Sequence, residues 1–165
     1  MSKLKTLHDL YVEHLQDLHS AETQLLKALP TMAKAAHDPA LKAAFEEHLG
    51  QTRIHVERLE GLCRQLNVTA KGETCKAMKG LIAESKHLAS ASADPAVRDA
   101  GLIAATQRVE HYEIAGYGCA RSYAEVLGDQ EATAILQRTL DEEGDTDHRL
   151  TEIASTLNLV ADRMG

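Results

Sequence analysis

The sequence predicts an all-α fold, a four-helix bundle with a short fifth helix between the second and third long helices. The chain has 165 residues, the length of one domain. Hydrophobic residues make up 44% of it but aromatic residues only 3%, and the commonest residues are good helix formers. A β-sandwich or barrel would need many more β-branched and aromatic residues. We therefore expect residues 1–165 to form a single helical domain.

A few start and stop signals set the expected helix boundaries. Asp38 and Asp94 each precede a proline, which is the pattern of an N-cap followed by the first helical residue. Gly128 is placed to end the third long helix. Pro30 lies inside the first periodic segment and should kink the helix or end it early. The expected long helices cover about residues 3–36, 39–66, 95–127 and 129–159.

The connector at 67–93 contains a shorter amphipathic stretch around Met78 and Ile82, which predicts the fifth helix. The connector is long enough to return along the whole bundle. This length favours a bundle with a long crossover over a simple up-and-down bundle.

Each long helix has a core-facing seam of apolar residues that carboxylate or imidazole groups interrupt near its middle. Glu22 lies about 16 residues before the first turn and His55 about 17 after it, so both are roughly 24 Å from that turn at about 1.5 Å per residue. The acids of the other two helices are similarly far from their own turn. We expect one layer made of Glu22, His55, Glu110, Glu113, Glu143 and Asp147.

Five carboxylates and one imidazole in a dry core need a counter-charge, because burying an unpaired charge costs several kcal/mol or more. Proton uptake is one solution, and it would lower stability as the pH rises. Lys and Arg are absent from the central seam positions. Two divalent ions would offset most of the charge, and carboxylates with one imidazole suit iron or manganese. The prediction is therefore a site for two divalent ions, iron or manganese.

Taken singly, these residues have simpler interpretations. A glutamate in a long helix usually faces solvent, and a lone His55 would more often be a hydrogen-bonded core histidine. Their coincidence at one level is what favours a metal site. Four secondary candidates are His19 as a ligand or a support for one, His48 as a structural hydrogen-bond partner, Gln51 as a weak amide ligand, and Tyr117 as an electron relay or a packing residue.

Four segments carry a more specific pattern: DLHSAETQLLKALPTMA, TCKAMKGLIAES, QRVEHYEIAGYG and TLDEEGDTDHRL. With these segments nearly the whole chain resembles the YciE/YciF family of bacterial ferritin-like proteins. The resemblance implies a ferritin-like bundle with a long crossover, a cytoplasmic location and a homodimer. It also implies a ferroxidase-type dinuclear centre and an association with stress responses.

By this resemblance the metal-binding carboxylates are Glu22, Glu110, Glu113 and Glu143. The chain departs from the general ferritin-like pattern at two positions. Gln51 stands one turn before His55, where a bridging glutamate is usual, and Asp147 stands one turn after Glu143 in place of a histidine.

Composition excludes several classes of function. The net charge of −7 argues against nucleic acid as a partner, because phosphates would be repelled. No apolar run reaches the ~18 residues needed to span a membrane. Three cysteines with no zinc-site spacing indicate reduced thiols in a cytoplasm.

Two functions of different classes remain. The first is oxidation of Fe(II) with O₂ or peroxide at a dinuclear iron or manganese centre. The alternative is a non-catalytic helical stress-response or interaction protein with a structural or vestigial metal site. A haem-binding bundle is disfavoured, because the carboxylates do not suit a porphyrin cavity.

Overall fold

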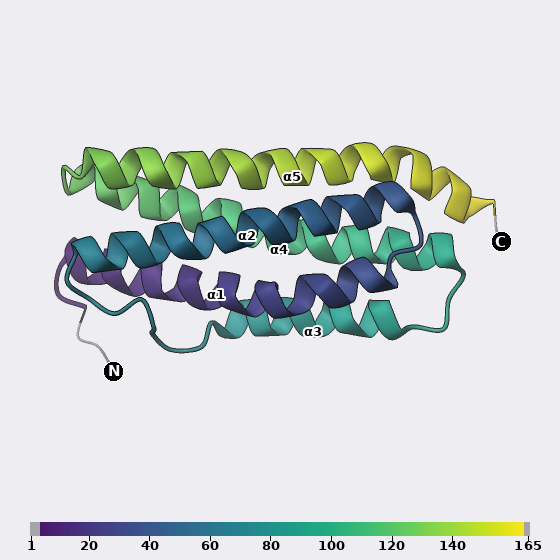
Figure 1. The fold of residues 1–165 in the computed structure, drawn as a ribbon, viewed down its shortest axis with the longest axis horizontal. Coiled ribbons are helices and arrows are strands. Elements are labelled where there is room, and N and C mark those ends of the chain that lie inside the picture. The colour runs from purple at the N-terminus through teal and green to yellow at the C-terminus, as the bar shows by residue number, and fades with distance from the viewer. Residues whose placement is uncertain (1–3, 164–165) are drawn as a thin grey trace.

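A computed structural model of the chain describes residues 4–163, which form five α-helices and no strand (Figure 1). The helices are α1 Leu7–Ala35, α2 Pro39–Gln65, α3 Lys76–Ser90, α4 Pro95–Val126 and α5 Gln130–Asp162. The predicted fold class, four long helices with a short one in the crossover, is confirmed. Over residues 4–163, no helix combines the length and the apolar character that crossing a membrane requires.

The four long helices form two antiparallel hairpins, α1 with α2 and α4 with α5, and α1 packs on α4 while α2 packs on α5 (Figure 1). The end of α1 lies beside the start of α4, since the His37 amide bonds Asp99. Helix α3 packs on α1 and α4 and returns the chain along the bundle. The connector therefore crosses the length of the bundle, as its length predicted.

The helix starts follow the expected cap signals. The Asp38 and Asp94 side chains accept hydrogen bonds from the first turns of α2 and α4, and a proline follows each. Asp129 caps α5 directly after Gly128, whose φ of +81° is the left-handed conformation that glycine adopts readily. These caps fix where each hairpin turns. They therefore determine which residues of each long helix lie in the middle of the bundle.

Pro30 lies inside α1 and does not end it, which rules out the early end that was one of its two expected effects. The helix continues to Ala35, and Pro30 is exposed. Leu29 and Met32 on either side of it are buried in the core. Their packing holds the last turns of α1 in place, although Pro30 has no backbone N–H to donate to the preceding turn.

Two apolar clusters lie at opposite ends of the bundle. Leu29, Met32 and Phe45 belong to the cluster near the α1–α2 turn. Tyr11 and Leu62 belong to the cluster near the α4–α5 turn. The middle of the bundle between them is polar, which is the arrangement that the interrupted seams predicted.

Asp99 ties the α1–α2 turn to α4. Its carboxylate, 1% exposed, accepts hydrogen bonds from the His37 amide at 3.0 and 3.1 Å and from the Asp38 amide at 2.6 Å. A buried acceptor of two backbone amides is costly to remove. Asp99 therefore helps to hold the two hairpins together at this end.

We predict that Asp99→Ala lowers the free energy of unfolding by about 2–3 kcal/mol, because two backbone amides lose their buried acceptor. Urea denaturation followed by circular dichroism measures the change. Asp99→Asn keeps one oxygen and should lose less. Equal losses in the Asn and Ala variants would contradict this role for the carboxylate.

Candidate metal centre

Six side chains from the four long helices meet in the middle of the core. They are Glu22 of α1, His48 and His55 of α2, Glu110 and Glu113 of α4, and Glu143 of α5. None of the six is more than 2% exposed. The helices place these side chains at one level of the bundle, because each hairpin turns at a comparable distance from that level.

The six side chains form two groups of potential metal ligands that share one residue. The ligand atoms of one group, His48, Glu110, Glu113 and Glu143, lie within 4.8 Å of one another. Those of the other group, Glu22, His55 and Glu143, also lie within 4.8 Å of one another. A carboxylate has two oxygens, so Glu143 can offer an oxygen to each group.

Several of these atoms approach closely without forming hydrogen bonds. His55 Nδ1 lies 3.2 Å from Glu22 Oε1 and 3.0 Å from Glu143 Oε1, and His48 Nε2 lies 3.3 Å from Glu110 Oε1. Among residues 4–163, no atom hydrogen-bonds either carboxylate oxygen of Glu110, Glu113 or Glu143.

A buried polar atom without a partner costs about 1–3 kcal/mol, and more if it is charged. Six carboxylate oxygens in this condition would be a heavy cost for the fold. They are also the donor atoms that iron and manganese prefer, in combination with imidazole nitrogen. The residues present therefore fit a metal site.

A second set of side chains orients these potential ligands. The Tyr117 hydroxyl donates a hydrogen bond to Glu22 Oε1 at 2.5 Å. His55 Nε2 lies 2.8 Å from Glu142 Oε2. Arg58 donates two hydrogen bonds to the same carboxylate, with nitrogen–oxygen distances of 2.6 and 3.0 Å. Because an ionised carboxylate only accepts, His55 donates through Nε2 and turns Nδ1 toward the centre.

Burial and mutual repulsion change the acidity of the cluster. Burial, together with the charges of Glu143 and Glu22, raises the pKa of Glu110 and of Glu113 well above its usual range. Burial opposes the charged form of His55, but Glu143 and Glu22 outweigh it and raise its pKa to about 10. In the metal-free protein, protons on this cluster therefore offset part of the repulsion.

The structure brings together five of the six predicted ligands and leaves Asp147 outside. The Asp147 side chain is 20% exposed, and its carboxylate accepts a hydrogen bond from Gln107 at 3.2 Å. His48, predicted as a structural hydrogen-bond partner, lies in the cluster instead. Two turns of helix bring His48 to within about 20° of the face of His55, whereas one turn carries Asp147 about 40° from Glu143.

Two secondary candidates also lie outside the cluster. Gln51 Oε1 accepts a hydrogen bond from Thr146 at 3.3 Å. His19 Nε2 lies 3.4 Å from Glu60, near the surface between α1 and α2. Sequence reasoning missed Glu142 and Arg58. The signal in the sequence that could have found Glu142 is its position beside Glu143.

The chain resembles proteins already described. It matches the family model for a domain of unknown function, DUF892, over residues 6–161. It is 42% identical over 152 residues to Protein YciF of Escherichia coli strain K12, which covers 92% of each chain.

Two solved structures share the fold. The crystal structure of the E. coli stress protein YciF superposes with a TM-score of 0.90 at 41% identity, over 93% of this chain and 98% of that one. YcfI of Rhodopseudomonas palustris, suggested to be a structural protein, superposes with a TM-score of 0.87 at 37% identity, over 90% and 95% of the two chains.

We predict that the metal-free protein loses stability as the pH rises from about 4.3, the ordinary pKa of glutamate, toward about 10, the raised pKa of His55. The raised pKa values of Glu110 and Glu113 mean that the folded state keeps protons that the unfolded state releases above about pH 4.3. Their stabilising effect is complete below that pH and is lost as the pH rises through the folded pKa values. His55, with its pKa raised to about 10, acts in the same direction.

Thermal unfolding after removal of metal with a chelator measures this dependence. A Glu110→Gln/Glu113→Gln variant has no proton to lose at these positions and should give a flatter curve. A melting temperature that rises over the interval in the metal-free wild type would contradict the prediction.

Proposed function

The chain belongs to the DUF892 family, and we propose that it holds a dinuclear metal centre that oxidises Fe(II) with O₂ or peroxide. The metal would be iron or manganese, held in a ferritin-like bundle. The observation that carries the proposal is the convergence of buried carboxylate and imidazole groups from four helices on one shared carboxylate, Glu143.

Each of the two groups of potential ligands would hold one ion. Glu22, His55 and one oxygen of Glu143 would hold the first ion. His48, Glu110, Glu113 and Glu143 would hold the second. Two such ions would supply the electrons that reduce O₂ or peroxide.

The charges of this arrangement balance. Four carboxylates carry four negative charges, and two divalent ions carry four positive ones, while both imidazoles bind as neutral ligands. From the sequence alone, five carboxylates were predicted in this layer, and their charge exceeds by one the charge that two divalent ions neutralise. Because Asp147 lies outside the cluster, the buried set is neutral when both ions are present.

Protein side chains also link the centre to solvent. His55 is fully buried, but its partner Glu142 is 28% exposed and Arg58 is 18% exposed. The contacts from Glu22 through His55 to Glu142 thus run from the core to the surface between α2 and α5. When a cation displaces the Nδ1 proton of His55, Glu142 stabilises the ring orientation that binds it.

The alternative is a non-catalytic protein of the stress response in which the metal serves only to hold the bundle together. One observation favours it: Gln51 stands where a ferritin-like centre usually has a bridging glutamate, and it bonds Thr146. The solved relative YcfI has also been suggested to be a structural protein. Metal binding without turnover would support this alternative.

We predict that the chain purified without chelator binds two transition-metal ions, measured by elemental analysis against protein concentration. Glu143→Gln should reduce the content most, because it removes a ligand from both groups. Glu22→Gln should affect one ion. Glu46→Gln, an exposed change on α2, is the control and should leave the content unchanged.

An absence of bound metal, together with full thermal stability in EDTA, would contradict this prediction. It would leave the buried carboxylates neutralised by protons alone.

We predict that the protein accelerates Fe(II) oxidation, followed by the rise of ferric absorbance in a stopped-flow instrument. Glu143→Gln should lose most of the acceleration, and Glu46→Gln should retain it. Equal rates for wild type and Glu143→Gln would show that the oxidation does not use the buried centre.

A further inference from the structure

Beside the metal centre lies a hydrogen-bonded chain of three side chains that the proposed function does not use. The Tyr112 hydroxyl donates to Asp17 Oδ2 at 2.5 Å, and Cys75 Sγ lies 3.0 Å from the same hydroxyl oxygen. Tyr112 directly precedes Glu113 on α4. The three residues thus connect α1, the start of α3 and the helix that carries two of the metal ligands.

The protons in this chain have a definite order. A phenol has one proton, and the Tyr112 proton lies in the short contact with the Asp17 carboxylate. The contact between sulfur and the phenol oxygen therefore needs the thiol as its donor. The order is from the Cys75 S–H to the Tyr112 O–H to the Asp17 carboxylate.

Cys75 is held in this position from both sides of its backbone. Its amide donates to Ser20 Oγ at 2.9 Å, and Gln24 Nε2 donates to its carbonyl at 3.1 Å. Both partners lie on α1, next to Asp17. Cys75 is 2% exposed and is not in a disulfide. The thiol is therefore fixed against the phenol and shielded from reagents in solution.

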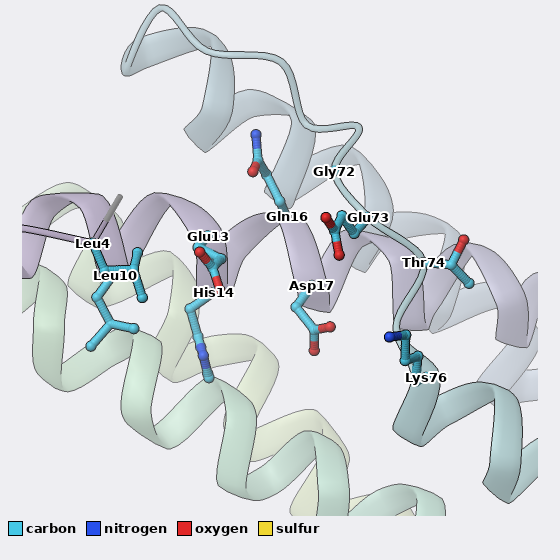
Figure 2. A pocket seen from close by; sticks show the side chains of 10 residues that line it. All are labelled: Leu4, Leu10, Glu13, His14, Gln16, Asp17, Gly72, Glu73, Thr74 and Lys76. Carbon is cyan, nitrogen blue, oxygen red and sulfur yellow. The ribbon is translucent and has the colours of Figure 1, made fainter. Parts of the chain in front are cut away.

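The Asp17 end of the chain reaches solvent. Asp17 lines a surface cavity of about 720 Å³ together with Thr74 and Lys76, the two neighbours of Cys75 (Figure 2). A proton that reaches Asp17 can leave through this cavity, while the thiol and the phenol stay inside the protein.

We propose that Tyr112 and Cys75 are a redox-active pair that supplies an electron to an oxidant at the neighbouring centre. Tyr112 gives one electron to the oxidant and its phenol proton to the Asp17 carboxylate, which leaves a phenoxyl radical and a carboxylic acid. The Cys75 S–H bond then breaks and gives a hydrogen atom to the phenoxyl oxygen. Tyr112 is restored, and the sulfur atom carries the radical.

The identity of the natural oxidant, a species that peroxide forms with Fe(II), depends on the proposed function. The pair itself rests on the contacts of Asp17, Tyr112 and Cys75. Tyr117 is the obvious competitor, because it donates to Glu22 in a contact of the same length. Glu22, however, is fully buried, whereas Asp17 lines the surface cavity through which a proton can leave, and Tyr112 also contacts a thiol.

The test uses the full-length, metal-free chain and hexachloroiridate(IV), a one-electron oxidant, with freeze-quenched samples examined by electron paramagnetic resonance. We expect a phenoxyl signal that Tyr112→Phe abolishes and that Tyr117→Phe, the matched control, retains. Cys75→Ala should lengthen the life of the signal. Asp17→Asn should slow its formation about 100-fold, the lower range for loss of a positioned base.

A signal that survives in Tyr112→Phe would overturn the proposal, as would one whose lifetime is the same with and without Cys75. Peptide mass spectrometry gives a second readout: oxidation of the buried Cys75 should require Tyr112, and equal oxidation of Cys75 in wild type and Tyr112→Phe would overturn the proposal. A second arm replaces the iridium reagent with Fe(II) and peroxide. A radical in the first arm alone supports the pair and counts against the proposed function.

Discussion

Burial of four carboxylates at one level of an apolar core is the constraint on which the rest of the structure depends. Water is excluded by the apolar clusters at both ends of the bundle, so the charges must be neutralised from within. His48 and His55 lie among the carboxylates, and Glu143 belongs to both groups of ligands. The proposed pair of divalent cations would neutralise these four carboxylates.

The sequence predicted the helices and most of the centre because both depend on spacing along one chain. Glu22 and Glu110 were found from their seam positions and their distance to a turn, and both are fully buried. Such reasoning fixes the level of a residue well but its rotation about the helix poorly. Asp147 was therefore predicted at the right level but lies on a face of α5 outside the cluster. His48 was assigned a lesser role than its place in the cluster supports.

Contacts between helices lay beyond sequence reasoning, because they depend on how each helix is rotated against its neighbour. Glu142 reaches His55 from 87 residues away, and Tyr112 reaches Asp17 from 95 residues away. Glu142 holds the imidazole that faces the centre, and Asp17 holds the phenol beside it. The carboxylates named here thus fall into two sets, one whose oxygens gather at the centre and one that orients the groups around it.

Anomalous X-ray diffraction from crystals of the chain grown with Mn²⁺ tests the two-ion centre most directly. Two anomalous peaks are expected within the bundle, one on each side of the Glu143 carboxylate, with Glu22 and Glu110 on different ions. A bundle with no anomalous density in its core, or with Glu22, Glu110 and Glu143 turned toward solvent, would contradict it.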